Sequence, residues 1–202
     1  MRDLGIRSII RSKRKYFGNA VKLRKPNIID QNFKAAASNI KWTTDVTYLY
    51  YNNMRFYLSV ILDLYNREVI SYAISNRNDI KLVEKTIIKA VLNAKDISGV
   101  ILHSDQGSLY TTEFYSRLLK SYNIIQSMSR KGNCLDNSPV ECFFSHLKSE
   151  LIYTTRFNTP EDMHQGVDQY INFYNKERLQ KNLNYQSPKT YKLNTSIPQV
   201  SH

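Results

Sequence analysis

Residues 41–63 read KWTTDVTYLYYNNMRFYLSVILD and contain two β-rich runs separated by a pair of asparagines. The first run alternates with the period of two that is typical of a pleated strand, and Asn52 and Asn53 supply turn chemistry before the second run. Asp45 is the exception in this pattern, because aspartate is depleted in strands. Taken alone, Asp45 is most simply explained as an acid at a sheet edge or on a solvated face.

The pattern of strands continues beyond this stretch and then alternates with helices. Short connections between the first three runs indicate an antiparallel meander, and the later apolar runs are separated by segments with helical spacing. Strands are predicted at about 41–50, 55–63, 67–75, 99–105 and 123–129, and helices at 78–95, 111–122, 138–151 and 159–175. The expected N-caps are Asn78 or Asp79, Ser138 and Thr159. This order predicts an α/β fold with a mixed five-stranded sheet, an antiparallel meander plus parallel strands, flanked by helices.

The charge distribution indicates a polyanionic partner. The net charge is +12, and residues 1–40 hold ten basic and two acidic side chains, which leaves +8 in this segment. A basic arm of this kind favours DNA or RNA over a membrane surface, since no amphipathic membrane helix is evident. The four basic residues that we expect to contact DNA here are Arg11, Lys13, Arg14 and Lys15. The alternative is a basic tail that only aids solubility.

Composition excludes several other classes of protein. No apolar run approaches the ~18 residues of a membrane span, and residues 1–18 lack the apolar core of a signal peptide, so a cytoplasmic protein is expected. Cys134 and Cys142 are the only cysteines and form no CxxC pair, which argues against a disulfide framework or a structural zinc site.

Three acidic residues occupy positions where a purely structural acid is unexpected. Asp45 interrupts the first strand, Asp105 ends the buried run VILHSD, and Glu141 opens the helix after GNCLDNSPV. The first and fourth strands are neighbours in a sheet of this order, and catalytic side chains are often displayed where a buried strand ends. Two acids from adjacent strands and one from a covering helix supply the oxygen ligands that Mg²⁺ prefers.

Each of these acids also has a structural interpretation. Glu141 lies three residues after Ser138, so SPVE can form a capping box, and Asp105 can accept hydrogen bonds from turn amides in SDQG. Asp63 and Asp136 lie near the same motifs and are interpreted as strand-end or turn residues. Spacing alone does not decide between a metal site and local capping.

Three motifs resemble those of a known family. WTTDVTY (42–48), HSDQGSLYTTEFY (103–115) and SMSRKGNCLDNSPVECFFSHLKSEL (127–151) are similar to motifs of the integrase-like transposases encoded by the second reading frame of IS-three family bacterial insertion sequences. The 35 residues between Asp105 and Glu141 match the separation in this branch of DDE enzymes, and the resemblance extends over nearly the whole chain. It implies a ribonuclease-H-like fold, which agrees with the strand order.

The resemblance also implies a function and a set of site residues. Asp45, Asp105 and Glu141 match the catalytic, metal-binding triad for DNA strand cleavage and strand transfer, with Mg²⁺, or Mn²⁺ as a substitute, as a pair of ions. Lys148 matches a lysine that contacts DNA near the scissile phosphate, and Arg130 and Lys131 are further expected DNA contacts. The partners implied are the terminal inverted repeats of the element, target DNA, further copies of the chain and the product of the upstream frame.

Some features depart from the family pattern. Leu135 stands where relatives usually carry tyrosine, Cys142 stands where serine is common, and the start of the chain is shorter than in relatives. We therefore expect a DNA-binding remnant and linker at 1–40, a catalytic core at 41–155 and a helical extension at 156–202. The alternatives are a truncated or inactive DNA-binding remnant and a ribonuclease-H-like nuclease. A retroviral-type integrase would need an N-terminal zinc module, for which the chain has too few cysteines and histidines.

Overall fold

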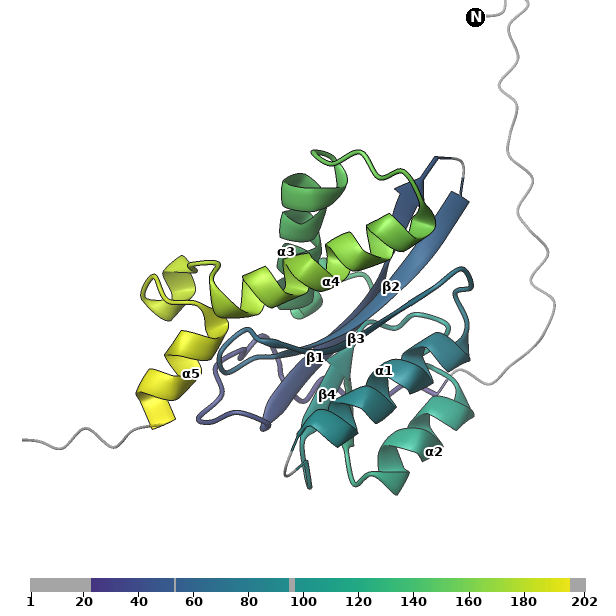
Figure 1. Cartoon of the computed structure of the whole chain (residues 1–202). Coiled ribbons are helices and arrows are strands. Elements are labelled where there is room, and N and C mark those ends of the chain that lie inside the picture. The colour runs from purple at the N-terminus through teal and green to yellow at the C-terminus, as the bar shows by residue number, and fades with distance from the viewer. Residues whose placement is uncertain (1–22, 53, 95–96, 197–202) are drawn as a thin grey trace, which may run out of the picture.

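The computed structural model describes residues 23–52, 54–94 and 97–196, and its centre is a five-stranded sheet (Figure 1). The strands are β1 (Lys41–Tyr51), β2 (Met54–Asp63), β3 (Val69–Ser75), β4 (Ile101–Ser104) and β5 (Ile125–Met128), in the order β3-β2-β1-β4-β5. The first three strands pair antiparallel, whereas β4 is parallel to both β1 and β5. This topology confirms the predicted mixed sheet and places β1 directly beside β4.

Helices cover both faces of this sheet. Figure 1 shows α1 (Ile80–Asn93) and α2 (Glu113–Ser121) together on one face, with α3 (Ser138–Leu147) and α4 (Pro160–Lys176) on the other. After α3 the chain continues as a single π-helical turn, Lys148–Ile152, and α5 (Pro188–Ser196) follows α4. No helix within the described part of the chain is long and apolar enough to cross a membrane.

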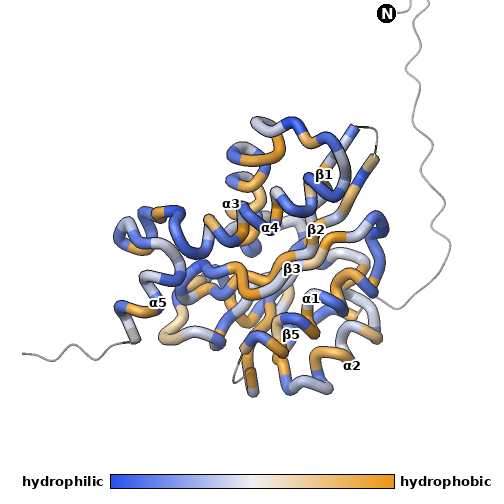
Figure 2. Tube along the Cα trace, viewed as in Figure 1, coloured by the Kyte–Doolittle hydropathy of each residue, from blue (hydrophilic) through white to orange (hydrophobic). Residues whose placement is uncertain are grey.

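Two apolar cores hold the three layers together, one on each face of the sheet. Trp42 and Leu102 pack with α1 and α2, whereas Leu58, Val60 and Leu62 of β2 pack with α3 and α4. Figure 2 shows the hydrophobic segments concentrated where the helices meet the sheet. Burying apolar side chains on both faces stabilises the sheet by about 1.5–3 kcal/mol for each large side chain.

Polar caps fix the starts of most helices. Asp79 accepts a hydrogen bond from the Leu82 amide and begins α1, as predicted, and Thr159 forms a reciprocal capping box with Asp162 at the start of α4. The predicted cap at Ser138 is wrong. A 3₁₀ turn, Cys134–Asn137, leads into α3, so that Ser138 is already helical and Asn137 is the N-cap.

Residues 23–33, which precede β1, form part of the packed structure. The Leu23 amide donates to the Thr111 carbonyl at 3.0 Å, the Met128 amide donates to the Pro26 carbonyl at 3.2 Å, and Ile29 is buried in the core beside α3 and α4. This segment therefore lies against the end of the sheet next to β5. The basic residues predicted to contact DNA within 1–22 lie outside the described residues.

Candidate active site

The parallel pairing of β1 with β4 brings Asp45 and Asp105 side by side. Thr43 pairs with His103, and each acid lies two residues further along its strand direction. Both carboxylates line a cleft of about 140 Å³, together with Asn78 of the segment before α1 and Tyr110. The sequence prediction that adjacent strands present these two acids together agrees with this placement.

Burial perturbs both carboxyl groups, and repulsion adds to its effect at Asp45. Desolvation raises the pKa of Asp45 to about 7, the negative charge of Asp105 adds to the effect, and the Val46 amide opposes it by donating at 2.7 Å to Oδ1. Burial also raises the pKa of Asp105. A cleft that destabilises two carboxylates in this way favours a cation between them, because a bound cation relieves both desolvation and repulsion.

The turn after β4 positions Asp105. Its Oδ1 accepts a hydrogen bond from the Gly107 amide at 2.8 Å, so the turn role suggested by SDQG is confirmed. A Cβ atom at residue 107 would lie 2.8 Å from the same oxygen, and therefore glycine permits this close approach. The Gly107 amide therefore fixes one oxygen of the Asp105 carboxylate.

Glu141 lies in the first turn of α3, is exposed, and caps nothing. No side-chain hydrogen bond caps α3, so the capping-box interpretation of Ser138 and Glu141 is wrong. The charge of Glu141 contributes to the raised pKa of Asp45, and partial burial raises the pKa of Glu141, with the charge of Asp105 adding to that effect. The three acids therefore share one electrostatic environment. As they stand, however, no three Asp, Glu, His or Cys side chains of the described residues are grouped closely enough to hold a metal ion.

Asn137 ties the start of α3 to the strand that carries Asp45. Thr43 Oγ1 donates to Asn137 Oδ1, and Asn137 Nδ2 donates to the Thr44 carbonyl at 3.3 Å. Thr43 and Thr44 immediately precede Asp45 in β1, and both are buried, as is Asn137. The side-chain amide of Asn137 could have capped α3, but it bonds to β1 and thereby sets the position of Glu141 relative to Asp45. Sequence analysis did not single out Asn137.

Asp136 is the centre of a second buried network. Its carboxylate accepts from the backbone amide and from Nε and Nη2 of Arg130, and also from Asn27 Nδ2 and Gln31 Nε2, each of the last two at 2.9 Å. The Arg130 guanidinium holds the pKa of Asp136 well below its usual range. Asp136 is therefore a turn residue, as predicted, as is the strand-end acid Asp63, which accepts from the Asn39 and Tyr65 amides.

This network bears on the expected DNA contacts. The Arg130 side chain is half-exposed, but its guanidinium is committed to Asp136 and lies 3.3 Å from Asp30. Lys131 follows in an exposed turn. A role for either residue in binding DNA stays a prediction.

Lys148 extends the site along β1. Its Nζ lies 4.8 Å from the centre of the Tyr48 ring, and burial lowers its pKa while the charge of Asp45 raises it. On the same exposed strand face, the Arg55 guanidinium lies over the Tyr48 and Tyr50 rings and donates to the Tyr50 hydroxyl at 2.9 Å. The carboxylates are therefore bordered by a cationic and aromatic surface. The sequence motifs predict a DNA contact at Lys148, but they do not single out Arg55.

Asp45→Asn is expected to stabilise the protein in metal-free buffer at pH 8 and to have little effect near pH 4. A carboxyl group whose pKa is raised on folding favours the folded state while it is protonated, and that stability is lost as pH rises from about 4 towards the folded value of about 7. Asparagine removes this penalty. Thermal unfolding at the two pH values in the presence of a chelator measures the difference, and an equal Tm for both proteins at pH 8 would contradict it.

Comparisons with known proteins show which class of protein the chain is similar to. An integrase core domain model matches residues 35–134, and a second integrase core domain model matches residues 141–195. The chain is 40% identical over 201 residues to the InsK transposase of insertion sequence element IS150 from Escherichia coli K12, covering 99% of this chain and 71% of the relative. It is 37% identical to the transposase of IS904 from Lactococcus lactis, covering 87% and 70%.

Solved structures share the fold at low identity. The integrase chain in the intasome of simian T-cell lymphotropic virus superposes with a TM-score of 0.71 at 18% identity, covering 84% of this chain and 58% of that one. The catalytic core domain of HTLV-2 integrase gives a TM-score of 0.58 at 15% identity, covering 78% and 97%. These likenesses confirm the ribonuclease-H-like fold.

The fold and the matching core domain define a polynucleotidyl transferase of the DDE transposase and integrase class. Within that class, the chain belongs to the integrase-like transposases of IS-three family insertion sequences. The identity to transposases over most of their length disfavours an unrelated ribonuclease-H-like nuclease.

Proposed function

We propose that Asp45, Asp105 and Glu141 are the catalytic carboxylates of this transposase and that they hold Mg²⁺, with Mn²⁺ as a substitute. The observation that carries the proposal is the pairing of Asp45 with Asp105 in one cleft where both pKa values are raised. Glu141 joins this electrostatic group from α3. The identification of these three residues as ligands is our inference from their placement.

The donor set fits a hard divalent cation. All three groups are carboxylates, and Mg²⁺ is typically bound by a few carboxylates while water and substrate phosphates complete its shell. The HTLV-2 integrase core was solved in complex with magnesium. Since the three acids are not grouped tightly enough to hold an ion as they stand, Glu141 is expected to move towards Asp45 and Asp105 when the site is loaded. A metal pair supplies activation of the nucleophile and stabilisation of the leaving oxygen.

The residues around the cleft position the DNA. The Lys148 ammonium group contacts the Tyr48 ring and interacts with the charge of Asp45, and we propose that it binds the phosphate next to the scissile bond. The nucleophile is water in strand cleavage and a 3′-hydroxyl in strand transfer, so no covalent protein intermediate is required. Asn137 holds the start of α3, the helix that carries Glu141, against the part of β1 next to Asp45.

The partners follow from charge and from relatives. The chain carries +12, which favours binding to the DNA of the element ends and of the target. The basic residues of the segment 1–40, including Arg11, Lys13, Arg14 and Lys15, are proposed to contact that DNA. Assembly of several copies on DNA is proposed by analogy with the viral intasome.

The test is strand cleavage and strand transfer on a labelled duplex that ends in the terminal repeat of the element. The wild-type protein with Mg²⁺ or Mn²⁺ should nick this duplex and join it to target DNA. Asp105→Asn should bind the duplex and fail to cut it. Cleavage by the wild-type protein in the presence of a chelator, or by Asp105→Asn, would contradict the proposal.

Lys148→Gln is expected to lower the rate of cleavage by roughly 10²-fold, because one charged group near the reacting phosphate is removed. The Tm should change little, since Lys148 forms a cation–π contact and no salt bridge among the described residues. Lys120→Gln is the matched control, because Lys120 is an exposed lysine on α2. An equal fall in both variants would show a general charge effect, and Lys148 would then have no local role.

A further inference from the structure

Arg67 occupies a conformation that is unusual for an arginine. It lies between β2 and β3, where a strand was predicted from residue 67, but β3 begins at Val69 and Arg67 adopts a left-handed backbone with φ of 61°. Such a conformation is uncommon for a residue other than glycine, asparagine or aspartate and costs on the order of 1 kcal/mol. A cost of this kind is often retained at a functional position.

The Arg67 guanidinium also lacks an acidic partner. It is partly buried, burial lowers its pKa, and it makes no hydrogen bond or ion pair with any residue that the structure describes. The electrostatic neighbours are the Tyr174 hydroxyl and the Cys142 thiol. Arginine is normally paired when it is removed from water, because an uncompensated charge is expensive to bury.

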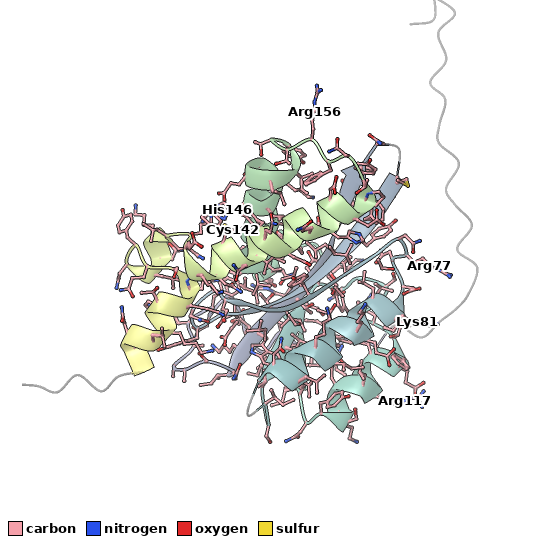
Figure 3. The ribbon with its side chains drawn as sticks, viewed as in Figure 1. Arg77, Lys81, Arg117, Cys142, His146 and Arg156 are labelled. Carbon is pink, nitrogen blue, oxygen red and sulfur yellow. The ribbon has the colours of Figure 1, made fainter. Side chains whose placement is uncertain are left out.

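Arg67 lines a pocket that contains several polar side chains and no carboxylate, beside the apolar side chains of Phe33 and Phe143. Its volume is about 310 Å³, and its walls include His146 of α3, Gln180 and Asn182 after α4, and Ser138 at the uncapped start of α3. The Gln180 Nε2 atom is buried, and the Tyr174 hydroxyl is the polar group that its side chain contacts. Figure 3 shows Cys142 and His146 close together on α3, on the side of the helix towards the segment that follows α4.

We propose that this pocket, centred on Arg67, binds a phosphate group, and that the source is a phosphodiester of the bound DNA. A guanidinium offers forked donors that match phosphate oxygens, and the side chains of Ser138 and Asn182 in the same walls add further donors. The assignment to DNA rests on the proposed function, whereas the phosphate chemistry rests on the pocket itself. Since the pocket is bordered by α3, phosphate binding there also fixes the helix that carries Glu141.

Cys142 provides a direct reporter of occupancy. It is an exposed free thiol in the wall of the pocket. The rate of its alkylation by iodoacetamide, read by mass spectrometry of the peptide that contains it, should fall severalfold when a short element-end duplex is added to the full chain. Inorganic phosphate serves as the second probe. Neither measurement depends on catalysis, so the result stands even if the chain fails to cut DNA.

Two variants assign the effect to Arg67. Arg67→Asn fits the left-handed backbone and removes the charge, and it should abolish protection of Cys142 and lower the slope of log affinity for DNA against log salt by about 0.9. Arg67→Lys should retain that slope. Arg117→Asn is the control, since Arg117 is exposed on α2 and lies far from Cys142 in Figure 3.

The outcomes of these measurements distinguish a phosphate of bound DNA from free inorganic phosphate as the ligand of the pocket. Protection by duplex that depends on Arg67 supports a DNA phosphate. Protection by inorganic phosphate alone supports the phosphate site and assigns it to the free ion. If neither the duplex nor inorganic phosphate protects Cys142 in the wild-type protein, the proposal is overturned, and this result does not depend on whether Arg67→Asn folds. If the duplex protects the wild-type protein but Arg67→Asn changes the salt slope no more than Arg117→Asn does, the role of Arg67 is overturned.

Discussion

Glu141→Gln is expected to lower cleavage and strand transfer by about 10²–10³-fold or more while the protein remains folded and bound to DNA. Glutamine has nearly the same size but lacks the negative charge that the proposed metal site requires, and removal of one group that stabilises transition-state charge typically costs this much. The capping role that would have predicted a loss of stability is absent, because Glu141 makes no cap at α3.

Thermal unfolding and DNA binding must accompany the activity assay. Glu113→Gln is the matched control, since Glu113 also lies in the first turn of a helix and loses the same interaction with the helix N-terminus. Both variants should therefore show similar small changes in Tm. Activity of Glu141→Gln comparable to that of the wild-type protein would refute the three-carboxylate site.

The fold could be predicted well because its signals are local. The alternation in β1, the apolar runs of β4 and β5 and the caps at Asp79 and Thr159 are all visible within short windows of sequence. The parallel pairing that joins Asp45 to Asp105 followed from the order of strands and helices. The placement of these two acids in one cleft was therefore accessible before the structure.

Long-range contacts between side chains could not be predicted from the sequence. Asn137 bonds to Thr43 and Thr44, more than ninety residues earlier in the chain, and such pairing leaves no local pattern. The error at Ser138 has a related origin. Ser138 and Pro139 carry the usual signals of a helix start, but the preceding 3₁₀ turn moves the boundary to Asn137, whose side chain is drawn to β1.

Asp136 shows how such contacts support the site. Five hydrogen bonds converge on one fully buried carboxylate, from Arg130, Asn27 and Gln31. They connect the segment before β1 to the loop that enters α3, and Asn137 follows directly. The position of Glu141 therefore depends on a charge that takes no part in the reaction.

Asp136→Asn is expected to destabilise the protein by about 3 kcal/mol at pH 7, within the range for breaking one side of a buried ion pair. The amide would face donors from Arg130, Asn27 and Gln31 with one acceptor oxygen instead of two, and it would lose the charge that pairs with Arg130. The cost stays near the lower end because the Arg130 side chain is half-exposed and can be hydrated. Urea unfolding measures the change in the free energy of unfolding.

The pH dependence of this loss in stability, and the same substitution at a second aspartate, test whether the charge of Asp136 is the cause. The folded pKa of Asp136 lies below its unfolded value of about 3.9, so its contribution is present above pH 4 and is lost as pH falls through the folded value. The difference between wild type and Asp136→Asn should therefore shrink in acid. Asp79→Asn makes the same chemical change at a partly exposed cap, where asparagine caps as well as aspartate does, and should cost less than about 0.5 kcal/mol. If Asp136→Asn and Asp79→Asn lose the same free energy of unfolding at pH 7, the buried network around Asp136 stabilises the protein no more than an ordinary helix cap does. That result would contradict its role in holding the entry to α3.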